Sequence, residues 1–213
     1  MYTTPSPPPA DAIVLFNGMD LNNWTVRDGK PAGWRAEDGI LCVVSGTGDV
    51  LSAQRMADFY LHLEFRCPDM PEASGQAKGN SGVYLQGRYE IQVLDSFGVD
   101  LPSTDDCGAI YDQFAPLVNA CWPAMQWQAY DMIFRAPRVE EGSIVEHSRL
   151  TVFHNGRVIH NNVQLLGVTG GALDEKVGEP GPLRLQDHGD VVAYRNIWAL
   201  PLALRGSLQY DPG

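Results

Sequence analysis

The feature that most constrains the fold of this chain is a two-residue alternation of apolar and polar side chains. In residues 59–66 every second side chain is apolar, and these four are Phe59, Leu61, Leu63 and Phe65. Successive side chains of a strand point to opposite faces, so this segment predicts a strand with one face in the core and one in water. Similar segments recur between Gly, Pro, Asn and Asp, and no apolar stripe of helical period spans ten residues. The pattern predicts an all-β fold.

Turn signals predict how some of these strands connect. Two β-rich runs meet at Asn155-Gly156, and this pair favours a type I′ hairpin because both central residues need positive φ. By the same argument, the segments Pro182–His188 and Val191–Leu200 are interpreted as a last strand pair joined across residues 189–190.

One long segment lacks any strand pattern. Residues 95–127 are rich in turn formers and aromatic residues, and long loops in compact domains are usually functional or disordered. The aromatic residues Tyr111, Phe114 and Trp122 favour an ordered loop that covers a site.

Composition limits the class of protein and its partners. The 213 residues suit one domain, and the 44% hydrophobic and 19% charged residues are typical of a soluble globular protein. No apolar run approaches the roughly 20 residues of a membrane span, so no membrane partner is expected. A net charge of −11 opposes phosphate contacts, so nucleic acid is not expected as a partner either. The oligomeric state stays open.

The ends of the chain are expected to lie outside the domain. Residues 1–12 predict a flexible, proline-rich leader, residues 13–202 the β-sandwich domain, and residues 203–213 a C-terminal tail. The leader has neither the basic nor the apolar region of a signal peptide. A cytoplasmic location therefore stays open.

Polar side chains share faces on two predicted strands. Arg184, Gln186 and His188 alternate on one strand, and Glu90 and Gln92 project together from another. Such faces are typical either of a groove that hydrogen-bonds a hydroxylated ligand or of an ordinary solvent face, and the repetition of the pattern favours the groove. Rings that could stack on a sugar are supplied by Tyr84, Trp122 and Trp127.

His188 and Glu90 are the candidate acid–base pair. The unperturbed pKa of histidine is about 6.5, so His188 beside a carboxylate could transfer protons near neutral pH. Residues 79–82, Gly-Asn-Ser-Gly, enter a predicted strand, and their glycines indicate either a tight turn or a site from which Asn80 reaches into the groove. The remaining histidines are expected to be structural: His62, His147, His154 and His160.

Metal and disulfide signals are weak. The four cysteines show no CxxC spacing and predict no zinc or redox site. Cys107 and Cys121 could form a disulfide in an oxidising compartment or remain buried thiols. Three carboxylates could gather a calcium-like divalent cation, but their spacing favours a solvated acidic loop: Asp105, Asp106 and Asp112. No cofactor is evident, and metal ligands are unknown.

Eight motifs in order resemble the 3-keto-disaccharide hydrolase family, over about residues 13–202. They are Leu15-Phe16-Asn17-Gly18-x-Asp20-Leu21-x-x-Trp24, Gly79-Asn80-Ser81-Gly82-Val83-Tyr84, Tyr89-Glu90-Ile91-Gln92-Val93-Leu94-Asp95, Gly108-Ala109-Ile110-Tyr111, Trp127-Gln128-x-Tyr130-Asp131, His154-Asn155-Gly156, Leu185-Gln186-Asp187-His188-Gly189 and Arg195-Asn196-Ile197-Trp198. The resemblance implies a concanavalin A-like jelly roll of two antiparallel sheets.

The resemblance also implies cleavage of glycosidic bonds in small carbohydrates already oxidised to a ketone at C3. This chemistry needs a base, an acid and donors to an enolate oxygen. Glu90 and His188 fit the first two roles in either order, and Arg184, Gln186 or Asn80 fits the third. The resemblance implies these substrate-binding residues: Asn80, Tyr84, Gln92, Asp95, Tyr111, Trp127, Arg184, Gln186 and Arg195.

Two features of the resemblance leave alternatives. Relatives often carry Glu-Trp where this chain reads Gln126-Trp127, so a catalytic glutamate of the family would be missing here. The same fold and groove also permit a non-catalytic carbohydrate-binding module, which is the alternative function. Many relatives are exported, which implies a periplasmic or extracellular location.

Overall fold

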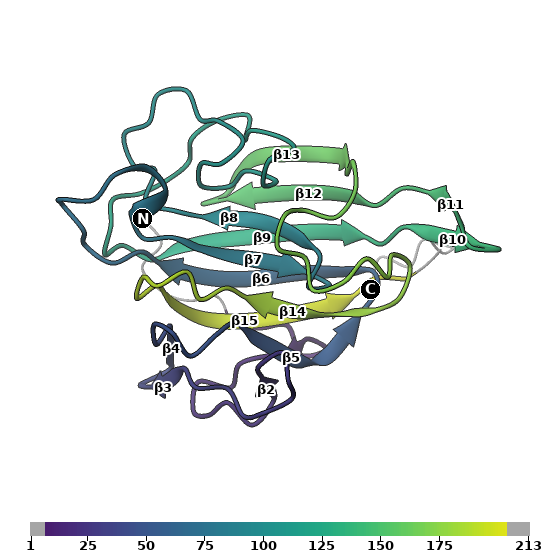
Figure 1. The fold of residues 1–213 in the computed structure, drawn as a ribbon, viewed down its shortest axis with the longest axis horizontal. Helices are drawn as coiled ribbons and strands as arrows, with labels where there is room; N and C mark the ends of the chain where they lie inside the picture. Colours follow the sequence, from purple (N-terminus) through teal and green to yellow (C-terminus); the bar gives the residue numbers. More distant parts are fainter. Residues whose placement is uncertain (1–6, 204–213) are drawn as a thin grey trace.

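The computed structural model describes residues 7–203, and these residues form two antiparallel sheets packed face to face (Figure 1). The expected leader therefore lies partly, and the expected tail almost wholly, outside the described residues. The strand pairings are antiparallel, as in the jelly roll that the resemblance implies. The all-β prediction is confirmed.

The larger sheet has eight strands. Their order is β13 (Arg157–Gln164), β12 (Arg149–His154), β9 (Gln128–Arg135), β6 (Phe59–Arg66), β15 (Ala193–Pro201), β4 (Ile40–Cys42) and β3 (Arg35–Glu37), with β1 (Ile13–Val14) paired to β15.

The smaller sheet has five strands, in the order β2 (Trp24–Thr25), β5 (Val50–Met56), β14 (Gly181–Leu185), β7 (Ser81–Leu85) and β8 (Tyr89–Val93). A separate two-stranded ribbon is formed by β10 (Arg138–Glu140) and β11 (Ser143–Glu146), and one 3-10 turn, η1, spans Gly75–Ala77.

The core lies between the two sheets. The four alternating apolar residues of β6 are fully buried, as predicted. Tyr89 of the smaller sheet contacts Phe134 of the larger one with ring centroids 5.3 Å apart, so aromatic rings join the layers.

The predicted water-facing side of β6 is wrong. His62 and Glu64 are only 2% and 1% exposed. Nδ1 of His62 lies 2.7 Å from a carboxylate oxygen of Asp131, and Glu64 accepts a hydrogen bond of 2.7 Å from Arg195. Alternation shows which side chains share a face, but not whether polar partners cover that face.

The two hairpin predictions have different outcomes. Asn155 and Gly156 have φ of 51° and 76°, and they join β12 to β13 as predicted. The predicted pairing of the last two strands is wrong, because β14 pairs with β5 and β7 whereas β15 pairs with β6. The Gly-Asp turn signal reports a local change of direction, and here the chain crosses between sheets.

The long segment between β8 and β9 is an ordered loop, as its aromatic content predicts. The amide of Asn119 donates to the carbonyl oxygens of Ser96 and Val99, and that of Asn155 donates to the carbonyl of Ala120. These bonds tie the loop to itself and to the β12–β13 hairpin.

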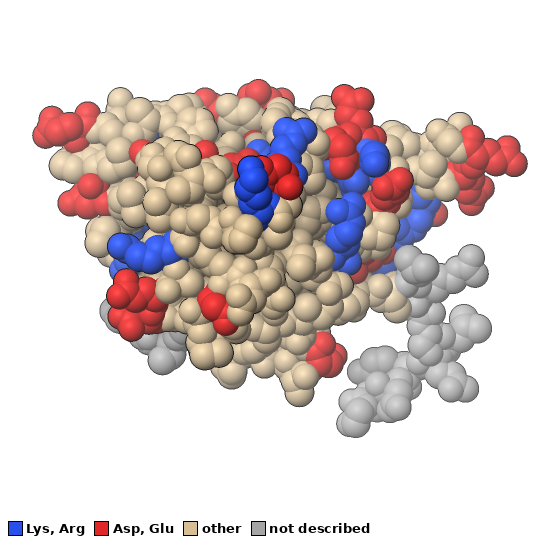
Figure 2. Space-filling view, turned by 60° about the horizontal axis from the view of Figure 1, so that its bottom comes forward, with Lys and Arg blue, Asp and Glu red and all other residues tan. Residues whose placement is uncertain are grey.

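Charged side chains of both signs are interspersed on the face shown in Figure 2. Acidic residues exceed basic ones by 26 to 15 in the whole sequence, yet that face presents neighbouring basic and acidic groups. No helix of the described residues is long and apolar enough to cross a membrane.

Candidate functional site

A row of side chains crosses the outer face of the smaller sheet. Leu51 of β5 is in register with Arg184 of β14, Arg184 with Tyr84 of β7, and Tyr84 with Glu90 of β8. Residues in register on antiparallel neighbours project to the same face. Leu183 and Leu185 alternate with Arg184 and are fully buried in the core. The row therefore points away from the core.

A cavity of about 260 Å³ opens on this face over β7, β8 and the end of β14. It brings together seven of the residues predicted to form the site. The lining residues are Gln76, Asn80, Tyr84, Glu90, Gln92, Tyr111, Gly170, Gly171, Gln186 and His188. Both predicted acid–base residues therefore share one cavity.

Glu90 is the buried carboxyl group of the cavity. It is 3% exposed, and its Oε2 accepts a hydrogen bond of 2.7 Å from the Tyr84 hydroxyl. Burial raises the pKa of Glu90 to about 7, against the opposing effects of the Tyr84 hydrogen bond and the Arg184 charge. A general base or acid works best when its pKa lies near the working pH.

Gly82 makes room for this carboxyl group. A Cβ atom at Gly82 would lie 2.3 Å from Oε1 of Glu90. Residues 79–82 enter the strand β7 as predicted, but turn geometry is limited to Gly79, whose φ is 64°, because Gly82 lies inside the strand. The glycine leaves space for a carboxyl group, as strand glycines often do for a close approach.

His188 lies on the exposed side of the cavity. The preceding residue, Asp187, is turned away and accepts hydrogen bonds from the backbone N–H groups of Gly48 and Gly189. This confirms the predicted parity, with Gln186 and His188 lining the cavity and Asp187 outside it.

Two amide oxygens near the cavity lack partners among the described residues. They are Oε1 of Gln92 and Oε1 of Gln186, and both atoms are buried. Nε2 of Gln92 donates to Gln76 at 3.0 Å, whereas Nε2 of Gln186 lies 3.4 Å from the Tyr84 hydroxyl. A buried acceptor without a donor is costly, so these oxygens are suited to accept hydrogen bonds from ligand hydroxyl groups.

The 3-keto-alpha-glucoside-1,2-lyase-like domain family has a model that matches residues 11–200 of this chain. The chain belongs to this family. No curated protein matches the chain.

Solved structures agree with membership of the 3-keto-alpha-glucoside-1,2-lyase-like family. A candidate glycosyl hydrolase from Parabacteroides distasonis is 40% identical, with a TM-score of 0.84 over 91% of this chain and 85% of that one. A second from the same organism is 19% identical, with a TM-score of 0.68 over 91% of this chain and 94% of that one. A third is also 19% identical, with a TM-score of 0.63 over 90% and 99% of the two chains. The last two support the fold alone.

Arg184 lies beside the cavity and does not line it. Its guanidinium lies 4.1 Å from the centroid of the Tyr84 ring and pairs with Asp49 at 2.6 Å. It also donates to the carbonyl oxygen of Gly171. With its donors engaged in this way, Arg184 positions Tyr84 and the loop above it.

Three other predicted binding residues lie outside the cavity lining. Asp95 pairs with Lys78 at 3.0 Å. Trp127 has the guanidinium carbons of Arg66 and Arg195 at 4.8 and 4.2 Å from its ring, so cations already contact this ring. Arg195 lies on β15 of the other sheet, where it pairs with Glu64. Trp122, the other proposed stacking ring, does not line the cavity either.

The sequence interpretation missed the loop that covers Glu90. The hydroxyl oxygen of Thr169 accepts a hydrogen bond of 2.9 Å from the backbone N–H of Glu90. Gly171 has φ of 70°, and a Cβ there would lie 3.1 Å from the Tyr84 hydroxyl. The Gly170–Gly171 pair was the available signal, but a glycine pair marks many loops. Gln76, on η1, carried no signal of its own.

The acidic loop and a cluster of two cysteines and a histidine lie outside the lining of the Glu90 cavity. Hydroxyl and backbone groups of Ser103 bond to Asp105 and Asp106. In the described part of the chain, Cys107, Cys121 and His154 place potential ligand atoms within 4.8 Å of one another, and both cysteines are free thiols. None of these three lines the cavity of Glu90.

Proposed function

We propose that this protein cleaves the glycosidic bond of 3-keto-glycosides by elimination and hydration. The observation that carries the proposal is the Glu90 carboxyl group, buried and held by Tyr84 at 2.7 Å in a cavity that also contains His188. A non-catalytic carbohydrate-binding module could use the unpaired amide oxygens of Gln92 and Gln186. It would have no use for the Glu90 carboxyl group with its pKa of about 7, so this group favours the enzyme.

The first step removes the proton on C2, which the C3 ketone acidifies. Glu90 in its carboxylate form takes this proton, and the electron pair of the C2–H bond becomes the C2–C3 double bond of an enolate. Gln186 carries an amide donor on the same cavity and could stabilise the enolate oxygen, whereas the amide of Asn80 already donates to the backbone and side-chain oxygens of Gln76.

The second step expels the group on C1. The enolate re-forms the ketone, a C1–C2 double bond forms, and the C1–O bond breaks. We assign His188 as the acid that protonates the leaving oxygen, because it lies on the exposed side of the cavity. Water then adds at C1 while C2 regains a proton, so the sum of the steps is hydrolysis.

The proposal requires no redox cofactor, because the ketone is already present in the substrate. A divalent cation is not assigned to any step. Activity that survives treatment with a chelator would support the cation-independent mechanism. Activity that is lost with the chelator and restored only by added cation would require a cation-dependent mechanism instead.

The test compares a 3-keto-glucoside with its unoxidised parent glycoside. The purified protein is incubated with each, and release of the aglycone is followed over time. We expect release from the keto substrate alone. Measurable sugar binding without release from the keto substrate would support the binding-module alternative instead.

A further inference from the structure

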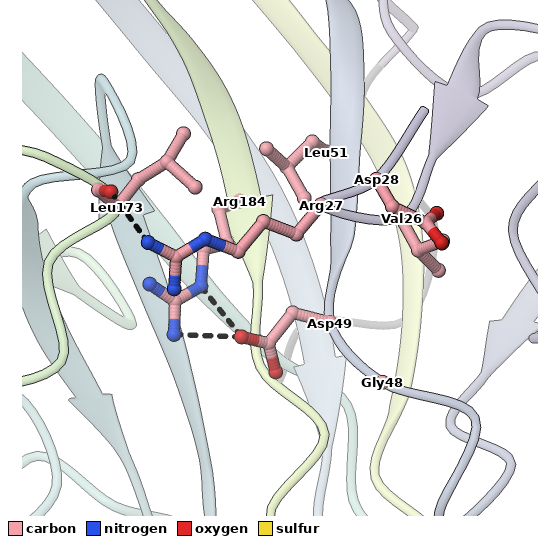
Figure 3. A pocket seen from close by; sticks show the side chains of 8 residues that line it. All are labelled: Val26, Arg27, Asp28, Gly48, Asp49, Leu51, Leu173 and Arg184. Atoms are coloured by element: carbon pink, nitrogen blue, oxygen red, sulfur yellow. Dashed lines mark hydrogen bonds and ion pairs between the residues drawn. The ribbon is translucent and has the colours of Figure 1, made fainter. Parts of the chain in front are cut away.

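A second cavity of about 290 Å³ lies on the same face of the smaller sheet (Figure 3). Its apolar wall is formed by Val26, Leu51 and Leu173. Polar groups around it are supplied by Arg27, Asp49 and Arg184. No step proposed above uses this cavity.

The two cavities are neighbours. Leu51 and Arg184 line the second one, and Tyr84 and Glu90 line the first. These four residues follow one another across adjacent strands, in register. Neighbouring strands are about 4.8 Å apart, so the row extends over about 14 Å. The guanidinium of Arg184, stacked on Tyr84, is the boundary between the two cavities.

The loop of residues 169–173 contributes to both cavities. Gly171 lines the first, and Leu173 lines the second. Arg184 donates to the carbonyl of Gly171, and Arg27 donates to that of Leu173 at 3.0 Å. Two arginines thus hold one loop, and Figure 3 shows the hydrogen bond from Arg27 to Leu173 at the second cavity.

The lining of the second cavity suits a ring with one apolar face and polar edges. Three aliphatic side chains offer contact area to C–H groups. Arg184 and Asp49 neutralise each other, whereas Arg27 has no carboxylate partner within ion-pair distance among the described residues. The Arg27 guanidinium can therefore donate to hydroxyl or ring oxygens of a neutral ligand.

We propose that this second cavity binds the leaving group of the substrate, which is a second sugar ring or an aglycone of similar size. The proposal rests on the function proposed above, because the leaving group must lie next to the C1 atom in the first cavity. The volumes of about 260 and 290 Å³ are similar, so the two cavities offer comparable space on either side of Arg184. His188 follows β14, the strand between the two cavities, and this placement suits the acid that protonates the bridging oxygen.

The experiment fills the second cavity with Val26→Trp. Two substrates share the same 3-keto-glucosyl ring: a methyl 3-keto-glucoside, whose leaving group does not reach the cavity, and a 3-keto-disaccharide of glucose. We expect kcat/KM for the disaccharide to fall at least about tenfold, the scale of lost apolar contacts in a pocket, and that for the methyl glycoside to change less than about twofold.

Matched variants control for general effects of the substitutions. Val158→Trp places the same ring on an exposed valine of β13, and it should leave both substrates unaffected. Arg27→Met should weaken the disaccharide selectively, and Arg55→Met, at an exposed arginine of β5, should not. Equal losses for both substrates in Val26→Trp, or no loss for either, would overturn the proposal.

A binding measurement separates failure of this proposal from failure of the proposed function. Calorimetric titration with unoxidised disaccharide and monosaccharide needs no cleavage. If the wild-type protein cleaves neither keto substrate, the function falls, but weaker disaccharide binding in Val26→Trp with unchanged monosaccharide binding still supports the second cavity. Unchanged disaccharide binding would refute it.

Discussion

The Tyr84 hydroxyl donates a hydrogen bond of 2.7 Å to the Glu90 carboxylate, and the two residues face each other in register on adjacent strands. The bond fixes the carboxyl group and favours its ionised form, while burial disfavours ionisation and prevails. Arg184 then holds the Tyr84 ring from the side of β14. The orientation and the proton affinity of Glu90 thus depend on the same contacts.

Removal of either proton-transfer group should abolish most turnover. We expect Glu90→Gln and His188→Ala each to lower kcat at least about a hundredfold, the usual scale for general acid–base groups. Release of aglycone from a 3-keto-glucoside measures this. The exposed residues Glu37 and His147 provide matched controls, Glu37→Gln and His147→Ala, which should retain activity. Near-normal turnover in both site variants would refute the assignment.

The pH profile should report the ionisation of Glu90. As a base, Glu90 must be ionised, and as the acid, His188 must be protonated, so kcat/KM should follow a bell-shaped pH profile. Its rising limb should have an inflection near the Glu90 pKa of about 7. Because the Tyr84 hydrogen bond lowers this pKa, Tyr84→Phe should move the inflection to higher pH. If Tyr84→Phe moves the falling limb of the profile and leaves the rising limb in place, Glu90 is the acid instead.

A methyl group at Gly82 should disturb the same carboxyl group. The Cβ of Gly82→Ala would lie 2.3 Å from Oε1 of Glu90, so the carboxyl group must move. We expect activity to fall about tenfold or more, because small misplacements of catalytic groups are costly. In a Glu90→Gln background the same substitution should cost little further activity, since the two changes act on one group. Additive losses would contradict this coupling.

Folding stability should depend on pH through His62. Burial would lower the pKa of His62, but hydrogen bonds with Asp131 and Glu64 outweigh it and raise the pKa to about 9. The folded state then binds the proton more tightly than the unfolded state, so this stabilisation is complete below about pH 6.5 and is lost as pH rises through about 9. The difference between the pKa of His62 in the unfolded state, about 6.5, and in the folded state, about 9, corresponds to a stabilisation of about 3 kcal/mol at most.

Urea denaturation of the wild type and of His62→Gln between pH 6 and 10 measures this contribution. We expect the wild type to lose stability relative to the variant across that range. Glu90 affects folding stability at lower pH, because its pKa is raised from 4.5 to about 7. Folding favours its protonated form, so its contribution to stability is lost as pH rises from 4.5 to about 7. Parallel curves for the two proteins above pH 6.5 would contradict the role of His62.

The sequence by itself determined the local features of this protein. Alternation identified the buried face of β6, Asn155-Gly156 identified a hairpin, and strand parity placed Gln186 and His188 on one face and Asp187 on the other. These features depend on residues close together in the chain, and backbone geometry fixes them there.

Tertiary structure alone decided which polar residues meet. Arg195 and Trp127 belong to motifs of the same family as Glu90, yet they lie with the other sheet, and Arg184 lies between two cavities. Sheet membership depends on pairings between strands far apart in sequence, which periodicity does not encode. The raised pKa of Glu90 likewise arises from burial by Thr169 to Gly171 and the surrounding strands, so it exists only in the folded chain.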